Sequence, residues 1–450
     1  MKIVIVGGGE VGFNIAKRLV QENKDVVIVE FDPEKVKKFA EEIDAQIILG
    51  SGSNPAVLKE AGIESAEMLI CVANSDEVNI VASFIAHIAN PEIIKIARIR
   101  NNELAKVFDS AKQSYGLDFC INPEQVASES IFKIIQIPGS TEVVDFAKGK
   151  IKLVAFHIQP NNKIIGKKLS DFFKQAGTEK ILITSIVRGN KVIIPRGDAV
   201  IKKHDTIYIV LEPSKLKKIM SFFGYEDYPV TKKVMIAGTG NMAINLARKL
   251  EAANIDVKML EKDYEKCATT AEYLNKSVVI CADATDKSIL EEENIADVDV
   301  FVAATDDEST NILSSMQAKN MGVKRVISIV NRMEFAPVIS AAGVDVIISP
   351  RMMAASSILQ FVRKGIILSV TEIRGEMAEA IEFVALDDSP IINKPLMEIK
   401  FPKGSLIGAI ERNGEIIIPT GNDIIRSGDK VFIIALTSAV SLIEKIIQKR

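Results

Sequence analysis

Short apolar runs alternate with stretches of helical periodicity in the first part of the chain. Amphipathic helical patterns occupy Gly12–Gln21 and Pro33–Glu42. Six further runs have the length and apolar character of strands: Ile3–Val6, Val26–Glu30, Ile47–Leu49, Met68–Val72, Ile94–Arg98 and Asp118–Ile121. Strands that alternate with helices predict a parallel sheet covered on both faces, which is the doubly wound α/β class.

The pattern changes after these strands. A helical stretch with an apolar stripe runs from Glu124 to Gln136, and Pro138-Gly139 ends it. The following residues are rich in strand patterns, and Gly189-Asn190 is typical of a tight turn between two strands. We therefore expect a crossover helix followed by a small α/β lobe.

The whole arrangement occurs twice. The segment Lys2–Gly12 reappears 231 residues later as Lys233–Ala243. Farther along, Arg188–Gly197 pairs with Arg412–Gly421, which contains a second tight turn at Asn413-Gly414. Self-similarity over such long segments indicates a tandem duplication of a unit of about 225 residues.

The duplication divides the chain into seven expected segments. They are Rossmann-type nucleotide-binding domains at 1–122 and 232–349, crossover helices at 123–139 and 350–366, small lobes at 140–223 and 367–450, and a linker at 224–231. The linker is polar and punctuated by Gly and Pro, as connecting segments are.

A glycine-rich turn follows the first strand. Gly7-x-Gly9-x-x-Gly12 opens a helix, and Glu30 lies 18 residues beyond the last glycine. In this context the pattern predicts a dinucleotide site, with pyrophosphate at the helix N-terminus and the ribose hydroxyls on the carboxylate. A carboxylate there also disfavours the 2′-phosphate of NADP. Asp32 is either a ribose contact or a helix N-cap.

The second copy has the Gly/Ala form of the same fingerprint. Gly238-x-Gly240-x-x-Ala243 is followed by Glu261, and Asp263 has the same two interpretations as its counterpart. The alternative is a retained turn that no longer binds nucleotide, and it applies more strongly to this copy. Both copies have the preceding strand, the following helix and the acidic residue, which predicts that at least one of them binds a nucleotide.

Composition and charge exclude several functions. The net charge of −3 provides no basic surface for nucleic acid. Val78–Pro91 and Val234–Ala247 are among the longest uncharged runs, and they have 14 residues, against the roughly 20 that a membrane-spanning helix needs. Strand residues begin at once, so we expect no signal peptide. The four cysteines form no CxxC or Cys/His cluster, which predicts no metal site and a reducing, cytoplasmic setting.

No catalytic acid or base can be assigned. A dehydrogenase needs a proton donor or acceptor near the hydride, and the only histidines are His87, His157 and His204. None has a histidine at the matching place in the other unit. We therefore expect the nucleotide to be a signal and not a reactant.

These features resemble the TrkA family of Trk potassium-uptake proteins, which is built from two tandem regulator-of-potassium-conductance (RCK) units. The resemblance covers essentially the whole chain. The segments that carry it are Gly7–Gly12, Gly238–Ala243, Gly50–Gly62, Pro195-x-Gly197 with Asp205, and Pro419-x-Gly421 with Asp429.

The resemblance implies a set of nucleotide contacts in each unit. By position, the first set is Gly7, Gly8, Gly9, Glu10, Val11, Gly12, Glu30, Asp32, Ser51, Ala73, Asn74 and Arg98. The second set is Gly238, Thr239, Gly240, Asn241, Met242, Glu261, Asp283 and Thr305. The implied ligand is NAD(H), with ATP or ADP as the alternative.

The resemblance also implies a biological role. It is that of a cytoplasmic regulatory subunit, peripheral on the inner face of the membrane, that forms a homo-oligomeric ring, as a dimer or tetramer, beneath a TrkH-type potassium-translocating subunit. Two other roles stay open. One is a ring subunit of another cation channel or antiporter, and the other is an NAD-dependent oxidoreductase.

The two units differ at positions that bear on the ligand. Arg98 is matched by Ile329, so a cation that could pair with phosphate is missing from the second copy. Glu124 is matched by Arg351, which makes an acidic function at that corner of the second unit doubtful. These differences predict two pockets with different affinities or ligands.

Overall fold

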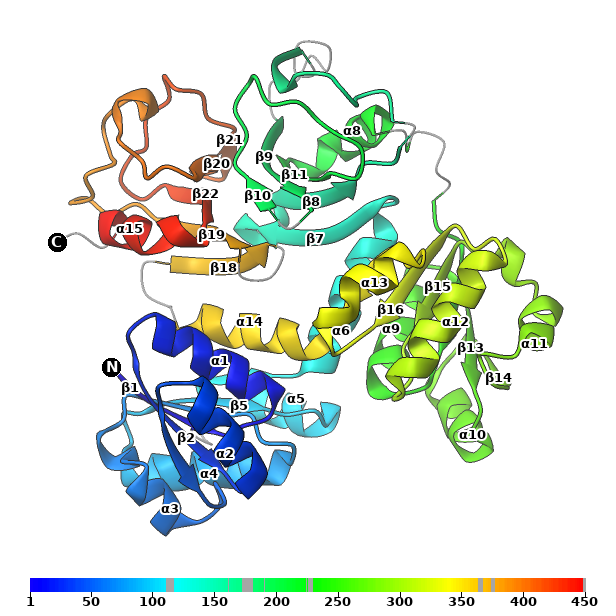
Figure 1. Ribbon diagram of the computed structural model, residues 1–450, viewed down its shortest axis with the longest axis horizontal. Coiled ribbons are helices and arrows are strands. Elements are labelled where there is room, and N and C mark those ends of the chain that lie inside the picture. The colour runs from blue at the N-terminus through cyan, green and yellow to red at the C-terminus, as the bar shows by residue number, and fades with distance from the viewer. Residues whose placement is uncertain are drawn as a thin grey trace.

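The computed structural model describes most of the chain, as Figure 1 shows. The described residues are 1–110, 117–160, 162–171, 181–189, 191–223, 225, 230–362, 367–373 and 377–447. Parts of three predicted features lie outside them: Asn190 of the first tight turn, residues 224 and 226–229 of the linker, and residues 363–366 of the second crossover helix. The domain boundaries stay predictions.

The first lobe is a six-stranded parallel sheet in the order β3-β2-β1-β4-β5-β6. Its strands are β1 Lys2–Val6, β2 Asp25–Glu30, β3 Gln46–Leu49, β4 Met68–Cys71, β5 Ile94–Arg98 and β6 Phe119–Ile121. Its helices are α1 Glu10–Gln21, α2 Pro33–Glu42, α3 Pro55–Glu60, α4 Asp76–Ala89 and α5 Asn102–Ser110. The central strands are buried almost throughout, because helices cover both faces. The predicted doubly wound fold is confirmed.

The second lobe repeats this order as β14-β13-β12-β15-β16-β17. Its strands are β12 Lys233–Ala237, β13 Asp256–Glu261, β14 Val278–Cys281, β15 Val300–Ala303, β16 Arg325–Ile329 and β17 Val346–Ile348. Its helices are α9 Asn241–Ala252, α10 Tyr264–Tyr273, α11 Lys287–Glu292, α12 Glu308–Asn320 and α13 Ala336–Ala341. In both sheets the strand order reverses beside the first strand, which is where such folds bind ligands.

Each small lobe contains a five-stranded antiparallel sheet, ordered β10-β9-β11-β8-β7 in one and β18-β19-β22-β20-β21 in the other. The first comprises β7 Ser140–Phe146, β8 Ile151–His157, β9 Ile181–Arg188, β10 Lys191–Ile193, β11 Thr206–Leu211 and α8 Leu216–Phe222. The second comprises β18 Ile367–Ile373, β19 Ala378–Val384, β20 Ser405–Arg412, β21 Glu415–Ile417, β22 Lys430–Leu436 and α15 Thr437–Ile447. The predicted turn at Asn413-Gly414 joins β20 to β21, and both of its residues have positive φ.

The two crossover helices are exchanged between the units. Helix α6 (Pro123–Gln136) packs against α9 of the second Rossmann lobe, and α14 (Pro350–Val362) packs against α1 of the first (Figure 1). Ile131 of α6 shares a buried core with Leu246 of α9, and Ile358 of α14 shares another with Ile15 of α1. Each Rossmann lobe therefore depends on a helix that follows the other one in the chain.

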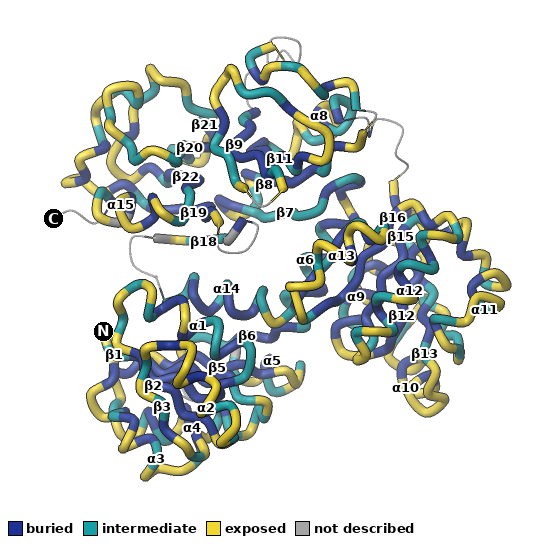
Figure 2. Tube along the Cα trace, in the orientation of Figure 1, coloured by how far each residue is buried: buried dark blue, intermediate teal, exposed yellow. Residues whose placement is uncertain are grey.

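The small lobes also pack on one another. Phe146 and Phe432 meet edge to face with their ring centroids 4.4 Å apart, inside a core to which both lobes contribute. Figure 2 shows this buried centre between the two lobes, with exposed residues on the outer loops. A buried ion pair joins the first Rossmann lobe to the second small lobe: Arg18 of α1 pairs with Glu379 of β19. The two units thus form one interlocked body.

Within the described residues, no helix combines the length and the apolar character that a bilayer crossing requires.

Candidate functional site

The first glycine turn is held tightly at one end and left open at the other. Gly7 has φ +101°, and a Cβ there would lie 2.5 Å from the amide nitrogen of Ala73. By contrast, nothing lies within 4 Å of a Cβ built on Gly9, the residue that precedes α1. The open space faces the amide end of the helix, where a phosphate would be favoured.

Glu30, at the end of β2, is buried and fully engaged with backbone amides. Its Oε2 accepts a hydrogen bond from the Gly8 amide at 2.6 Å, and its Oε1 accepts from Phe31 and Asp32 at 3.0 Å each. The carboxylate therefore fixes the turn itself. Asp32 is the N-cap of α2, accepting from Glu34 at 3.0 Å, so the structure shows the capping interpretation.

A second loop closes the far side of the first site. Asn79 binds the amide and the carbonyl of Ala73 and the carbonyl of Arg98, which ties the ends of β4 and β5 together. The Arg98 guanidinium reaches Asn74 Oδ1 at 3.4 Å, while its buried Nε has no partner. Burial and the nearby Arg100 lower the pKa of Arg98 to about 10. This side of the site is therefore cationic and incompletely hydrogen-bonded.

Two other predicted contacts, Ser51 and Val11, lie in different settings, an exposed loop and a buried helical turn. Ser51 lies on the exposed loop after β3, where its Oγ is 2.8 Å from that of Ser53. Val11 is buried in the first turn of α1, so only its backbone is available to a ligand. Gly12 packs against the carbonyl of Gly7, and a Cβ would collide with that oxygen at 1.9 Å.

The second turn borders an open hollow with a volume of about 140 Å³. The hollow is lined by Gly238, Thr239, Gly240, Leu260, Glu261, Lys262, Lys266, Ala282, Asp283, Ala284, Thr305, Asp306, Asp307 and Thr310. It therefore gathers most of the residues that the sequence predicts for this unit. Asn241 and Met242 lie beside it in the first turn of α9.

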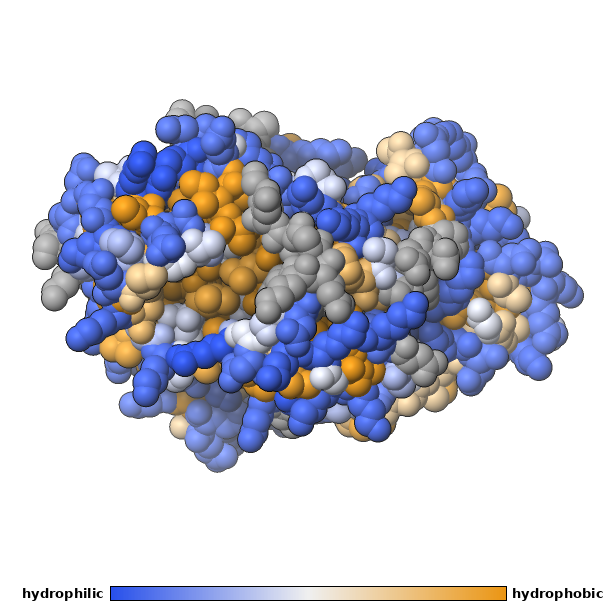
Figure 3. Space-filling model, turned by 90° about the horizontal axis from the view of Figure 1, so that it is seen from above, coloured by the Kyte–Doolittle hydropathy of each residue, from blue (hydrophilic) through white to orange (hydrophobic). Residues whose placement is uncertain are grey.

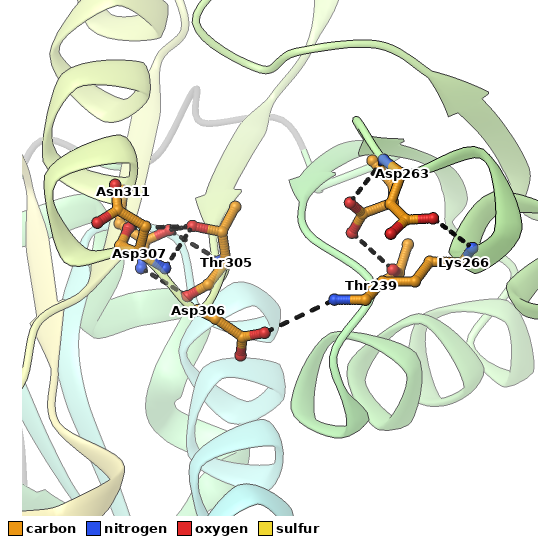
Figure 4. Close-up of polar contacts among 8 residues, drawn as sticks. Thr239, Asp263, Lys266, Thr305, Asp306, Asp307 and Asn311 are labelled. Atoms are coloured by element: carbon orange, nitrogen blue, oxygen red, sulfur yellow. Dashed lines mark hydrogen bonds and ion pairs between the residues drawn. The ribbon is translucent and has the colours of Figure 1, made fainter.

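The second turn, drawn in Figure 4, is tied to its carboxylate by the hydroxyl of Thr239, whereas the first turn uses the Gly8 amide. Thr239 donates its hydroxyl proton to Glu261 Oε2 at 2.7 Å, and the Asp263 amide donates to Oε1 at 3.1 Å. Asp263 itself caps α10. Lys266 on α10 lies 3.9 Å from Asp306 across the hollow. An ion pair between exposed groups of this kind is weak and can open to admit a ligand.

The far wall of the hollow repeats the clamp of the first site. Asn311 binds the amide and the carbonyl of Thr305 and the carbonyl of Ile329, at 2.8 to 3.2 Å. Asp283 is fixed by the backbone amide and the hydroxyl of Thr285, and these hydrogen bonds lower the pKa of its carboxyl. Its negative charge therefore persists in this pocket.

Each turn receives a side chain from the crossover helix of the other unit. Arg351, in the first turn of α14, lies 2.6 Å from the carboxylate of Glu10. At the matching place, Glu124 of α6 accepts a hydrogen bond from the side-chain amide of Asn241 at 3.5 Å. Burial raises the pKa of Glu124. The acidic corner that the sequence assigns to the first unit therefore faces the turn of the second, and the arginine faces the first.

Sequence reasoning missed the roles of the two clamps, Asn79 and Asn311, and of the two crossing residues. The clamps had a signal, because these asparagines match in the repeat. The crossing residues Glu124 and Arg351 had none, because the repeat does not show which lobe each helix packs on. The sequence also did not predict that the cationic Lys262 lines the second hollow.

The chemistry available at these sites is the binding of anions and riboses. Helix N-termini, amides and cations meet carboxylates at both turns. Among the described residues, no three or more His, Cys, Asp or Glu side chains are placed to hold a metal ion. His157 and His204 face each other in the first small lobe, with ring centroids 6.0 Å apart, and His87 lies at the end of α4, so none lines the hollow.

Comparison with known proteins agrees with this architecture. The TrkA-N domain family matches residues 3–123 and 234–350, and the TrkA-C domain family matches residues 153–224 and 380–448. The chain is 35% identical to the Trk system potassium uptake protein TrkA homolog 2 of Methanosarcina mazei over 99% of its own length and 100% of that protein. It is 35% identical to TrkA of Halomonas elongata, with 97% and 96% covered.

Solved structures share the fold at low sequence identity. The crystal structure of the GsuK RCK domain superposes with a TM-score of 0.63 at 16% identity, covering 100% of this chain and 95% of that one. The GsuK channel bound to NAD gives the same TM-score and identity, covering 79% of that chain. The tandem family matches and the full-length relatives show that the chain belongs to the TrkA family of Trk system potassium uptake proteins.

Proposed function

We propose that this protein is the nucleotide-sensing regulatory subunit of a Trk-type potassium uptake system, and not an enzyme. The exchange of the crossover helices carries the proposal. Arg351 and Glu124 each link one unit's crossover helix to the other unit's turn. A nucleotide that binds a turn must then act on a helix that continues into a small lobe. Family membership supports potassium uptake as the process that is regulated.

The ligand class follows from the charges around each turn. Arg100 and Arg351 both act electrostatically on Arg98 at the first site, and this gathering of positive charge suits a ligand with several phosphate charges. At the second site, Lys262 and Lys266 stand beside Glu261 and Asp283, a mixed setting that suits a nucleotide with one pyrophosphate and free ribose hydroxyls. NAD(H) and ADP or ATP are therefore the candidate ligands. The GsuK structures bound to NAD and to ADP belong to a protein with the same fold.

Exposed apolar side chains support assembly into a ring. Val81, Phe84 and Ile88 lie on one face of α4 and are all exposed. In the second lobe, Phe335 and Val338, around the start of α13, are exposed too. Apolar faces of this kind are typical of protein contacts. A second copy of the chain is the natural occupant, which gives a homo-oligomer of two or four chains.

A membrane subunit of the TrkH type is the proposed partner, with this protein peripheral on the cytoplasmic face. Figure 3 shows apolar side chains gathered within a largely hydrophilic surface on the face seen from above, where the small lobes lie. In the second small lobe, Leu386, Met397 and Ile424 are exposed. Such a surface could carry the nucleotide-dependent change to a channel.

The mechanism is a population shift between two arrangements of the ring. A ligand shifts the equilibrium only by the difference between its affinities for the two arrangements. Moving a ring from 1:99 to 99:1 requires about 5.5 kcal/mol of such difference, which several pockets can share.

Titration calorimetry tests the proposal directly. Purified protein would be titrated with NAD⁺, NADH, ATP and ADP, alongside Gly9→Asp and Gly240→Asp variants that place a carboxylate where the pyrophosphate should lie. We expect saturable binding that each variant abolishes in its own pocket only. Potassium uptake would be measured in cells that lack the gene and carry each variant. Absence of binding in the wild type, or uptake indifferent to the gene, contradicts the proposal.

A further inference from the structure

Two cysteines meet at the edge of the second pocket. Cys267 lies in the first turn of α10, and its thiol donates to the carbonyl of Glu261 at 3.2 Å. Cys281 ends β14, opposite Glu261 in the parallel ladder, and its thiol lies 4.0 Å from the carbonyl of Lys262. The two sulfur atoms therefore lie next to the carbonyls of consecutive residues, Glu261 and Lys262. The thiol of Cys281 lies close enough to that of Cys267 to raise its pKa.

The two thiols have different access to solvent. Cys281 is exposed, whereas Cys267 is 8% exposed. Burial and the neighbouring thiol raise the pKa of Cys267 to about 12, so this sulfur stays protonated and unreactive toward a dissolved oxidant. An oxidant in solution would therefore meet Cys281 first, and Cys267 would be the residue that reacts with the oxidised product.

The other two cysteines cannot form the same bond. Cys71 and Cys120 stand on opposite sides of Ala97 in the first sheet, one strand apart on each side. Strands lie about 4.8 Å apart, so the two Cα atoms are about 9.6 Å apart. A disulfide needs Cα atoms within about 7 Å. In the first unit the places of Cys267 and Cys281 are taken by Val36 and Leu49.

We propose that Cys267 and Cys281 are a redox modification site, at which a hydroperoxide forms a reversible disulfide that weakens nucleotide binding in the second pocket. The proposal rests on the proposed function in one respect, that this pocket binds nucleotide. The neighbours of the pair line the pocket: Lys266 precedes one cysteine, and Ala282 follows the other.

The chemistry balances in two steps. The Cys281 thiolate attacks one oxygen of hydrogen peroxide, so that an S–O bond forms, the O–O bond breaks and hydroxide leaves to take up a proton as water. The Cys267 sulfur then attacks the sulfenic sulfur of Cys281; the S–S bond forms and the S–O bond breaks. The thiol proton of Cys267 leaves with the departing hydroxide as a second water. Two thiols and one peroxide give one disulfide and two waters.

The bond has a structural consequence for the ligand. Sulfur atoms in a disulfide are about 2.05 Å apart, far closer than two thiols in contact. Closing that gap draws the first turn of α10 toward β14. Asp263, whose amide binds the Glu261 carboxylate, and Lys266, which lines the same hollow, both lie at that end of α10. Their displacement disturbs the place where the ribose would bind, while the first pocket has no such tether.

The test maps the bond and measures the pocket separately. Full-length protein would be treated with hydrogen peroxide, digested without reductant and analysed by mass spectrometry. Variants Cys267→Val and Cys281→Leu introduce the residues of the first unit at the same places, so they are matched controls that preserve the fold. We expect a linked Cys267–Cys281 peptide in the wild type, absent from both variants and removed by dithiothreitol.

Nucleotide affinity would be measured with ADP and NAD⁺ on a Gly9→Asp background, where the second pocket alone can bind. We expect oxidation to raise the dissociation constant at least tenfold, and dithiothreitol to restore it. Both cysteine variants should show no effect of peroxide. Peroxide treatment that yields only a sulfonic acid at Cys281, or a disulfide that leaves the affinity unchanged, overturns the proposal. Failure of the reduced Gly9→Asp protein to bind either nucleotide removes nucleotide sensing from this pocket, while the peptide map still reports on the bond.

Discussion

The guanidinium of Arg351 lies 2.6 Å from the carboxylate of Glu10, across 341 positions of the chain. One residue belongs to the crossover helix α14 and the other to the glycine turn of the first site. Both side chains are partly exposed to solvent, so the pair contributes little to stability. Its importance is positional, because it joins the site where a phosphate would bind to the helix that leads into a small lobe.

Replacing Arg351 should change ligand binding more than stability. We expect Arg351→Glu to lower the free energy of unfolding by at most about 1 kcal/mol, as for other exposed ion pairs. The same change places a like charge beside Glu10 and the phosphates, so the affinity of the first pocket for ATP should fall at least tenfold. Denaturant unfolding and calorimetry measure the two effects. The double variant Glu10→Arg/Arg351→Glu is the control, since it restores the pair; failure to regain affinity would show that the link is incidental.

Two glycines of the second turn should respond differently to the same added methyl group. Gly238 has φ +102°, and a Cβ there would lie 2.6 Å from the carbonyl oxygen of Ala304. Gly238→Ala should therefore destabilise the fold by about 2 kcal/mol or more, through backbone strain and collision. A Cβ on Gly240 meets only Asp306 at 4.0 Å, so Gly240→Ala should leave the melting temperature nearly unchanged.

The same pair separates folding from binding. Gly240→Ala should weaken NAD⁺ binding at the second pocket, because its methyl group occupies the side from which the pyrophosphate approaches. Thermal unfolding and calorimetry on both variants give the comparison. Equal losses of stability in the two would mean that the turn has a different shape from the one described.

A buried ion pair repeats in the two small lobes and can be tested in either. Arg412 binds both carboxylate oxygens of Asp429 at 2.9 and 2.7 Å, as Arg188 does with Asp205 at 2.8 Å. The aspartates are buried, and the pairing raises the pKa of both arginines. Asp429→Ala leaves a partly buried cation unpaired and should destabilise the protein by about 3 kcal/mol.

Denaturant unfolding measures this loss. The matched control is Asp388→Ala, which removes an exposed carboxylate of the same lobe and should change stability by less than about 0.5 kcal/mol. Similar effects of the two substitutions would show that the Arg–Asp pair does not hold the lobe together.

Local features of this fold could be predicted from sequence, and cross-unit features could not. The strands of the first sheet and the turns at Gly7 and Gly238 follow from patterns a few residues long. Glu30 is an example. The pattern places a carboxylate at the end of β2, but it does not show that the carboxylate oxygens accept hydrogen bonds from the amides of Gly8, Phe31 and Asp32. The partner of a side chain depends on the loops around it, which short patterns do not specify.

The exchange of α6 and α14 could not be predicted from the sequence, and the reason is physical. A repeat of two similar units gives two similar apolar helix faces and two similar lobes to receive them. Packing each helix on its own lobe or on the other buries much the same kind of surface. Only the three-dimensional arrangement shows that Arg325 of β16 donates to the carbonyl of Ile134 at 2.8 Å, fixing the end of α6 against the second lobe. In the matching place the first lobe has Ile94.

A partly buried carboxyl group in the first small lobe should make stability depend on pH. Glu142 of β7 accepts a hydrogen bond from the Tyr208 hydroxyl at 2.7 Å, and burial raises the pKa of its carboxyl to about 7 from an ordinary value of 4.5. The folded state therefore holds a proton that the unfolded state has already released between those values. The contribution of this group is fully present below about pH 4.5 and is lost as the pH rises to about 7.

Glu142→Gln removes this contribution without removing the partner of Tyr208. Melting temperatures of the wild type and the variant would be compared between pH 4.5 and 8. We expect the wild type to lose stability relative to the variant across that window, and the difference to level off above it, because no further proton is released. The second lobe has Ser369 at the matching place, so it carries no carboxyl group there. Parallel profiles for wild type and Glu142→Gln would show that the carboxyl group titrates at its ordinary pKa.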